Sequence, residues 1–434
     1  MKLLISNAHV IPATGGREFT GDIAVEGKRI VYVGPPGGVP AGFEPDEIID
    51  ATGMAATPGL VNCHTHAAMT LFRGYADDLP LMDWLAQKIW PIEAKLNSED
   101  VYWGSLLAGL EMLKSGTTTF ADQYFEMDRV AQAVDEIGLR AVLCRGLIGL
   151  APHADQALAE SRDFVRTWHG AAGGRITTML GPHAPYTCPP TYLKKVMQTA
   201  DELGIGMHIH LSETRTEVEQ IKQEYGCSPV ELMERTNLFA YPVLAAHCVH
   251  LSDTDIEILA RRGVGVAHNP QSNMKLGSGI APVARMLTAG VNVGIGTDGA
   301  ASNNDLNMVE EMRAAALLQK VALEDPTVLP AAQVLEMATI GGARALGLDG
   351  EIGTLETGKK ADIVLWNLNQ AHLWPPHSLQ AHLVYSASRA DVDTVIVDGQ
   401  VLMRGRRVRT VDEETVLHAT ARCARRLVDA ISSA

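Results

Sequence analysis

The sequence predicts an α/β fold, a (β/α)8 barrel with a small β-sandwich domain built from both ends of the chain. Eight short apolar runs alternate with helical stretches between residues 58 and 347, a span near the ~250 residues typical of such barrels. Short β-type runs separated by turn signals flank this span. An open, doubly wound sheet is the alternative, but no Gly-x-Gly-x-x-Gly pattern follows a predicted strand.

The flanking runs suit a small antiparallel sheet, in which Asp398-Gly399 forms a two-residue hairpin turn. The strands expected there are 3–10, 22–25, 29–33, 361–366, 394–397 and 400–404. The last stretch of the chain is amphipathic and is expected to pack outside the barrel as a helix. The expected parts are therefore the β domain (1–57 and 348–410), the barrel (58–347) and the C-terminal helix (411–434).

The barrel strands are short and strongly apolar, and the helices between them carry clear end signals. In the helix expected over 99–114, Asn97 or Ser98 can cap the start and Gly116 can end it. Two acidic residues in its first turn suit the positive end of the helix dipole. The predicted strands are 60–64, 117–122, 140–147, 176–183, 206–211, 243–248, 263–268 and 291–297.

Bulk composition excludes several classes of protein. The formal charge of −15 argues against a duplex-binding surface, because phosphate contacts need clustered Lys and Arg. The start of the chain lacks a sustained apolar segment, and no apolar run approaches the ~20 residues of a membrane span. The six cysteines form no Cys-x-x-Cys pair, which is typical of reduced thiols in the cytoplasm.

Polar residues end most of the predicted barrel strands, where the active site of such a barrel lies. His64 and His66 are two residues apart, so on a strand both imidazoles face the same point. Any single histidine at a strand end could be a core or rim residue whose ring nitrogens are hydrogen-bonded. So many histidines at one rim of the barrel indicate a functional site. The strand-end residues are His64, His66, Arg145, His183, His210, His247 and Asp298.

His64, His66 and His210 together with Asp298 form a set of neutral imidazoles and one carboxylate that suits zinc, with iron or manganese as alternatives. The fold is therefore expected to be metal-dependent. Catalytic zinc commonly has three protein ligands and a water, so we expect Asp298 to bind weakly. It can then act as the base that takes a proton from a metal-activated water.

Glu213 lies three residues after His210, so it is expected in the loop beyond the strand, leaning over the metal. A carboxyl group there can carry a proton to a heteroatom beside the attacked carbon. The alternative is that Glu213 only serves the start of the next helix, with Ser212 or Thr214 as the cap.

Five motifs spread over nearly the whole chain carry a resemblance: Pro58-Gly59-Leu60-Val61-Asn62-Cys63-His64-Thr65-His66, Trp90-Pro91-Ile92-Glu93, Gly181-Pro182-His183-Ala184-Pro185-Tyr186, His208-Ile209-His210-Leu211-Ser212-Glu213 and Gly296-Thr297-Asp298-Gly299. With them the sequence resembles the amidohydrolase superfamily and, within it, the 5-methylthioadenosine/S-adenosylhomocysteine deaminases. The resemblance implies a small purine nucleoside as substrate and leaves a homo-oligomer open.

Relatives with two metals carry a bridging lysine on strand four, but residues 176–183 contain none, so the resemblance implies one zinc ion per chain. It further implies that His247 orients the attacking hydroxide, which a neutral imidazole can do. The implied reaction is hydrolytic attack on C6 of an adenine, protonation of N1 by Glu213, and loss of ammonia. Glu213 and Asp298 would thereby contact the substrate as well.

The resemblance also implies that Glu93 accepts hydrogen bonds from the ribose hydroxyls, as a carboxylate can. Arg145 and His183 would contact the substrate and Trp84 would form an apolar wall. Glu93 as a helix-start acid and Trp84 as core packing are the alternatives.

Some family members use a second arginine, in the loop after strand three, to bind the homocysteine carboxylate. Residues 146–161, which form this loop, contain no arginine. The rival functions are a guanine-type deaminase or triazine chlorohydrolase of the same superfamily, and a catalytically inactive barrel that serves as an assembly protein. The guanine-type deaminase and the triazine chlorohydrolase need the complete metal set, whereas an inactive barrel does not. Neither of these two enzymes needs Glu93 to hold a ribose.

Overall fold

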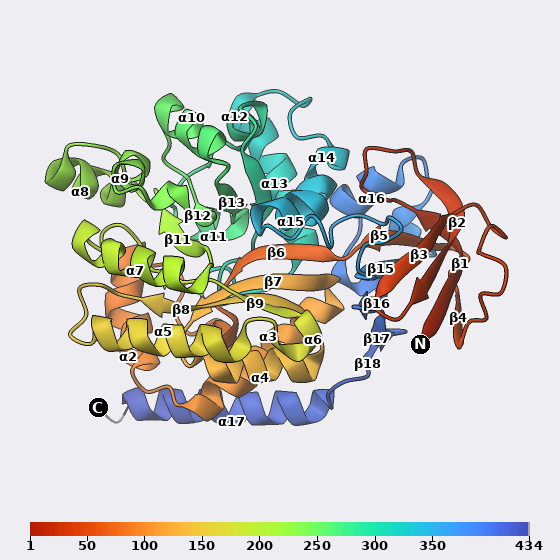
Figure 1. Cartoon of the computed structure of the whole chain (residues 1–434), viewed down its shortest axis with the longest axis horizontal. Helices are drawn as coiled ribbons and strands as arrows, with labels where there is room; N and C mark the ends of the chain where they lie inside the picture. The colour runs from red at the N-terminus through yellow and green to blue at the C-terminus, as the bar shows by residue number, and fades with distance from the viewer. Residues whose placement is uncertain (433–434) are drawn as a thin grey trace.

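The structure is a computed structural model that describes residues 1–432, in which a barrel lies beside a second, β-rich unit (Figure 1). The barrel strands pair in parallel in the order β10-β8-β7-β6-β14-β13-β12-β11, with β9 also beside β8. The predicted barrel is confirmed. Its strands are β6 (Leu60–Thr65), β7 (Thr117–Tyr124), β8 (Arg140–Leu147), β9 (Ile176–Thr178), β10 (Gly181–Pro182), β11 (Met207–Leu211), β12 (Val243–His247), β13 (Gly265–His268) and β14 (Asn292–Ile295).

The fourth predicted strand is broken into β9 and β10, and the sheet closes at this break. The Leu180 backbone N–H donates to Gly206 O at 3.0 Å, and the His208 N–H donates to Leu180 O at 2.8 Å. Gly181 passes so close to β8 that a Cβ atom there would lie 2.5 Å from the carbonyl oxygen of Arg145. Closure brings the ends of β10 and β11 together, and with them His183 and His210.

Helices surround the barrel (Figure 1). The expected helix over 99–114 is α3, where Asn97 caps the start by accepting from the N–H groups of Glu99 and Asp100 at 2.9 and 3.1 Å. The helices of this layer are α3 (Ser98–Lys114), α4 (Met127–Ile137), α5 (Ala154–Trp168), α6 (Ala171–Gly174), α7 (Pro190–Leu203), α8 (Arg215–Tyr225), α9 (Pro229–Arg235), α10 (Asp253–Arg262), α11 (Pro270–Lys275), α12 (Val283–Thr288), α13 (Met308–Leu323), α14 (Ala331–Glu336) and α15 (Gly342–Ala345).

Short helical turns follow β6. A 3-10 turn (Ala67–Phe72) comes first, then α1 (Leu81–Trp84), a π-helical turn (Leu85–Ile89) and α2 (Trp90–Glu93). Their apolar side chains lie at the carboxyl ends of the barrel strands and line the cavity described below.

The two chain ends contribute to one mixed sheet in the order β18-β17-β16-β15-β5-β1-β2-β3, with β4 paired to β1. The expectation of an antiparallel sheet is wrong for β1, because β4 and β5 pair with it in parallel. The two-residue turn at Asp398-Gly399 is present, with φ of +52° and +78°. The strands are β1 (Lys2–Val10), β2 (Phe19–Glu26), β3 (Arg29–Gly34), β4 (Glu47–Asp50), β5 (Met54–Pro58), β15 (Ile363–Asn367), β16 (Val392–Val397), β17 (Gln400–Arg404) and β18 (Arg407–Val408).

The two α-helices after residue 348 pack against helices of the barrel. Helix α16 (Leu379–Tyr385) packs against α13 and α14, and α17 (Glu413–Ser432) runs along α3 at the edge of the barrel (Figure 1). Short 3-10 turns occur at Leu238–Ala240, Ala371–Leu373 and Arg389–Asp391. The expected C-terminal helix thus corresponds to α17 within the described residues.

A buried charge cluster joins the two units at the amino end of β8. Arg140 donates to both oxygens of Asp362 at 2.8 and 3.1 Å and to Asp398 at 3.3 Å. Asp398 also pairs with Lys28 at 2.9 Å. Arg140, Asp362 and Asp398 are almost completely buried. The small sheet therefore covers the amino ends of the barrel strands and leaves the carboxyl ends free for a site.

None of the helices within residues 1–432 is long and apolar enough to cross a membrane. All six cysteines are buried and unpaired in this part of the chain.

Candidate metal centre and active site

Four side chains from three segments meet at the carboxyl ends of the strands. Oδ1 of Asp298 lies 3.4 Å from His64 Nε2 and 3.2 Å from His66 Nε2. His66 Nε2 lies 3.4 Å from His210 Nε2. All four of these predicted ligands thus turn one atom toward a common centre. His64 also groups with His210 and His247, whose ligand atoms lie within 4.8 Å of one another.

The outer ring nitrogens of these histidines have partners that fix the rings. His66 Nδ1 lies 2.6 Å from Gln123 O, and His210 Nδ1 lies 2.8 Å from His183 O. A carbonyl oxygen can only accept, so in the neutral rings each Nδ1 carries the proton and each Nε2 presents a lone pair to the centre.

The residues fit a zinc ion. Ligands at about 2.0–2.1 Å from tetrahedral zinc lie about 3.3 Å apart, close to the spacings of His64, His66 and His210 from their neighbours in the set. Nε2 of His64 is buried and has no hydrogen-bond partner. Burial lowers the pKa of His64 to about 3, so its ring is neutral, the form that binds metal.

The Asp298 carboxylate stabilises positive charge at this centre. Burial alone lowers the pKa of His66, but the hydrogen bond and charge of Asp298 raise it to about 9. The same carboxylate would favour a bound cation at this place. Ser272 Oγ and Ser302 Oγ donate to Asp298 Oδ2 at 2.6 and 2.9 Å, leaving Oδ1 to the centre.

Glu213 and His247 face each other beside the centre. Glu213 Oε2 lies 3.9 Å from His247 Nε2, and both side chains are buried. His247 Nδ1 lies 2.9 Å from Asn273 Oδ1 and 3.3 Å from Asn269 Nδ2. When Nδ1 donates to Asn273, the shorter of the two contacts, Nε2 is an acceptor. Burial raises the pKa of Glu213. A carboxyl group whose protonated form is favoured by burial thus lies against an imidazole.

Left-handed backbone conformations place three of these segments. Ser212, His247 and Asp298 have φ of +52°, +73° and +60°, values that are uncommon for residues other than glycine. Each occurs where a strand ends and the chain turns into its loop. Backbone strain of this kind is retained mainly at functional sites, which agrees with the chemistry of the side chains.

A cavity of about 380 Å³ opens onto this centre. Trp84, Glu93, His183, Glu213 and Asp298, five of the predicted substrate contacts, line it. The pKa of Glu93 is raised to about 6, because burial outweighs the hydrogen bond that it accepts from Tyr124 at 2.7 Å. The other wall is apolar, formed by Met69, Leu81, Leu85, Trp90, Phe125, Ile148 and Leu276.

Arg145 is the predicted site residue that the structure does not bring to the cavity. Its guanidinium pairs with Glu160 of α5 at 2.7 Å and does not line the space. Side chains alternate along β8, and the neighbouring Cys144 faces the barrel interior, so Arg145 points to the helix layer. Strand β8 also continues to Leu147, so Arg145 is not its last residue.

Several residues of the site were not predicted. His208 lies 2.9 Å from His64 Nδ1 and supports that ring from behind. Tyr124 bonds Glu93, and Glu217 bonds the backbone of the loop that carries Glu213. His208 is the other histidine of a predicted strand, and Glu217 stands three residues after Thr214 in a helix-start pattern, so both carried a signal.

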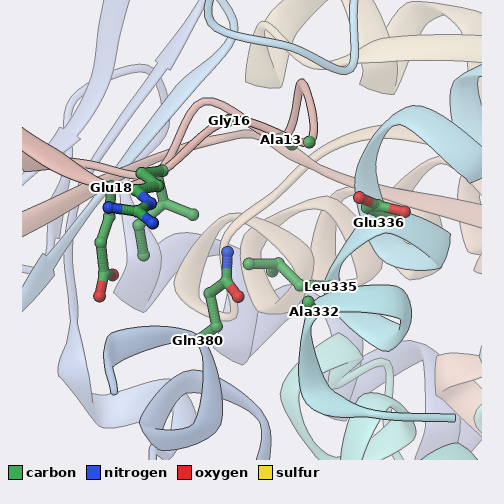
Figure 2. Close-up of a pocket in the computed structure, with 10 residues that line it drawn as sticks. Ala13, Gly16, Glu18, Ala332, Leu335, Glu336 and Gln380 are labelled. Atoms are coloured by element: carbon green, nitrogen blue, oxygen red, sulfur yellow. The ribbon is translucent and has the colours of Figure 1, made fainter. Parts of the chain in front are cut away.

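A second cavity, of about 430 Å³, lies between the loop after β1 and helices α14 and α16. Figure 2 shows Glu18 and Glu336 on opposite sides of it, with Gln380 and Leu335 between them. Its lining contains no histidine or cysteine and no cluster of converging acids. It offers no set of groups for catalysis.

Comparison with known proteins agrees with this site. Residues 55–402 match the amidohydrolase family. The chain is 77% identical, over 99% of its length and the whole of the relative, to a 5-methylthioadenosine/S-adenosylhomocysteine deaminase of Desulforudis audaxviator. It is 59% identical to the protein of that name from Moorella thermoacetica, over 96% of this chain and 97% of the relative.

Solved structures are similar over the same length. An adenosine deaminase from Xanthomonas campestris with bound zinc superposes with a TM-score of 0.94 at 37% identity, covering 100% of this chain and 99% of that one. An atrazine chlorohydrolase from Arthrobacter aurescens, also with zinc, gives 0.90 at 27% identity, with 97% and 100% covered. The barrel, the histidine-rich centre and these similarities together establish that this chain belongs to the amidohydrolase family.

Proposed function

We propose that this protein is a zinc-dependent hydrolytic deaminase of adenine nucleosides that converts 5′-methylthioadenosine, S-adenosylhomocysteine or both to the inosyl product and ammonia. One observation carries the proposal: the cavity that is lined by three of the candidate metal ligands and by Glu213 is also lined by the half-buried carboxylate of Glu93, which suits a ribose-binding site. The names of the relatives support it.

When bound by His64, His66, His210 and Asp298, zinc would supply Lewis acidity that makes a water molecule nucleophilic near neutral pH. The rest of the work falls to the protein. Asp298 accepts the proton of the attacking water, and His247 orients that water through the lone pair of Nε2. Glu213 then donates a proton to N1 of the purine as C6 is attacked. Asp298 passes the proton that it took from the water to the amino group, which leaves as ammonia, and Glu213 regains a proton from the C6 hydroxyl as the carbonyl forms.

Glu93 provides the ribose contact in this proposal. Its two oxygens can accept from both hydroxyls, and Tyr124 donates to one of them at 2.7 Å and holds the carboxylate in place. His183 and Trp84 lie on the same cavity and serve as further contacts. Arg145 would have to leave Glu160 to reach a substrate, so we assign it no contact with the nucleoside.

The fold and the metal set alone do not separate a nucleoside deaminase from a triazine chlorohydrolase, because the Arthrobacter aurescens enzyme shares the fold. Glu93 does separate them, since a triazine has no ribose for it to bind. The direct test is ammonia release by the purified protein from methylthioadenosine, S-adenosylhomocysteine, adenosine and adenine. Activity on none of these would refute the proposal.

The ribose contact predicts strong discrimination against free adenine. Without ribose the half-buried Glu93 carboxylate keeps only Tyr124 as partner, so kcat/KM for adenine should be at least about 100-fold below that for methylthioadenosine. Glu93→Ala should reduce the ratio of kcat/KM for methylthioadenosine to kcat/KM for adenine. Lowering the pH through about 6, where Glu93 takes up a proton, should reduce the same ratio. Similar kcat/KM values for adenine and methylthioadenosine in the wild type would refute the contact.

At the 5′ end of the nucleoside, the lining contains no lysine or arginine among the described residues, and its other wall is apolar. Methylthioadenosine should therefore equal or exceed S-adenosylhomocysteine in kcat/KM in the same assay. A strong preference for S-adenosylhomocysteine would show that a cation reaches the tail.

We further expect one zinc ion per chain. The two overlapping groups of candidate ligands share His64 and so describe one centre, and residues 176–183 supply no bridging lysine. Metal analysis of the purified protein measures the ratio, and two tightly bound ions per chain would contradict it. Asp298→Asn should retain part of the zinc but turn over poorly, because the base is lost.

A further inference from the structure

The carboxylate of Glu217 holds the backbone of the loop that carries Glu213. Its Oε1 accepts from the Ser212 N–H at 2.9 Å, and its Oε2 accepts from the Glu213 N–H at 2.8 Å. Glu217 is 4% exposed, although it lies in the first turn of α8 on a helix whose outer face is charged. Both oxygens of a buried acid are thus used on two consecutive backbone groups.

This contact differs from ordinary helix capping. Thr214 caps α8 by accepting from the Glu217 N–H at 3.1 Å. In a capping box the acid three residues later returns to the N–H of the cap residue itself. Glu217 instead reaches past Thr214 to the two residues before it, so its side chain stabilises the loop rather than the helix end.

The loop needs such support because its backbone leaves the strand conformation immediately after β11. Glu213 follows β11 at a position where a continued strand would point it away from His210. Ser212 takes a left-handed conformation, with φ of +52°, and this redirects Glu213 into the cavity. A left-handed serine costs free energy and persists only where its surroundings hold it.

The other side of the same loop is held by the segment after His247. Ser212 O accepts from the N–H groups of Val249 and His250 at 3.0 and 2.9 Å. Ser212 is therefore tied through its N–H to Glu217 and through its carbonyl to the chain that carries His247. These hydrogen bonds fix the two segments that carry Glu213 and His247. Glu213 Oε2 thereby lies 3.9 Å from His247 Nε2.

The geometry points to Glu217 as a positioning residue that sets the place of the Glu213 carboxyl group relative to His247 and the substrate. It does not touch the substrate and acts only through Glu213. This inference rests on the proposed proton transfer by Glu213. A displacement of a catalytic group by about 1 Å can cost about 100-fold in rate, so the loss of either backbone contact should be visible in kcat.

Glu217→Gln tests this role with almost no change in side-chain size. Glutamine has one acceptor oxygen, and its NH₂ group would face a backbone N–H, so one of the two contacts is lost. We expect kcat to fall by about 10-fold to 100-fold, with zinc content unchanged and KM changed by less than about twofold. Glu219→Gln, on the exposed face of the same helix, makes the same charge change and should leave kcat unaltered.

A double-mutant cycle separates positioning from a general structural role. In Glu213→Gln there is no carboxyl group to place, so adding Glu217→Gln should lower kcat by less than about twofold. Product is quantified chromatographically after long incubation, so that slow turnover is still measured. If Glu217→Gln lowers kcat by the same factor in both backgrounds, or no more than Glu219→Gln does, the inference is overturned.

Two further outcomes are informative. If Glu217→Gln fails to fold, Glu217→Asp provides the same cycle, because it keeps the charge but reaches less far, and it should show a smaller loss in the wild-type background only. If Glu213→Gln alone has normal kcat, the proposed proton transfer fails and not the placement of the loop. The two hypotheses therefore fail in different experiments.

Discussion

Glu213→Gln is expected to lower kcat by about 10²-fold to 10⁴-fold, the usual contribution of a general acid or base. Glutamine keeps the size and polarity of the side chain but cannot carry the proton. Glu213 is buried beside His247, and burial raises its pKa, which favours the protonated form that a proton donor needs. The Glu213 N–H contact to Glu217 involves the backbone and should survive the change.

Steady-state kinetics with methylthioadenosine measure the effect, and zinc analysis of the same sample shows that the metal centre is intact. Glu219→Gln is the matched control, because Glu219 is an exposed acid on α8, four residues after the helix begins. A glutamine variant with near-normal kcat would remove Glu213 from the mechanism.

His210→Ala is expected to abolish activity by removing zinc. The ring is fixed by its contact with His183 O at 2.8 Å and turns Nε2 toward His66. Because loss of a residue that only supports a ligand costs about 10-fold to 100-fold in metal affinity, loss of the ligand itself should cost more. The pKa of His210 is held well below its usual value by burial, so the wild-type ring is ready to bind metal without losing a proton.

Competition with a chromophoric chelator gives the zinc affinity of wild type and variant. His418→Ala, an exposed histidine on α17, is the control and should bind zinc as the wild type does. Stoichiometric zinc of unchanged affinity in His210→Ala would show that the ligand set has been assigned wrongly.

The barrel and the meeting of the four candidate metal ligands were predictable because both depend on local patterns. Short apolar strands follow one another at regular intervals, and the residues at their ends must meet once the barrel closes. His64, His66, His210 and Asp298 converge for this reason alone. No knowledge of side-chain conformation was needed.

Residues whose effect depends on backbone direction were harder to predict. Arg145 is directed outward by alternation along β8, whose inward-facing positions include Cys144, and the sequence does not mark which set of alternate residues faces inward. Glu217 acts on a left-handed turn at Ser212 that nothing in the sequence marks, since serine rarely adopts that conformation. In the small sheet, β4 and β18 are too short to give a periodic signal.

The buried cluster around Arg140 has a consequence for synthesis of the chain on the ribosome. The guanidinium belongs to the third barrel strand, but its two carboxylate partners, Asp362 and Asp398, are translated more than 200 residues later. Until then the small sheet cannot cover the amino end of the nascent barrel, so Arg140 stays in contact with water and lacks the two counter-charges that accompany its burial. The barrel thus reaches its final stability only after the C-terminal strands have emerged and closed over it.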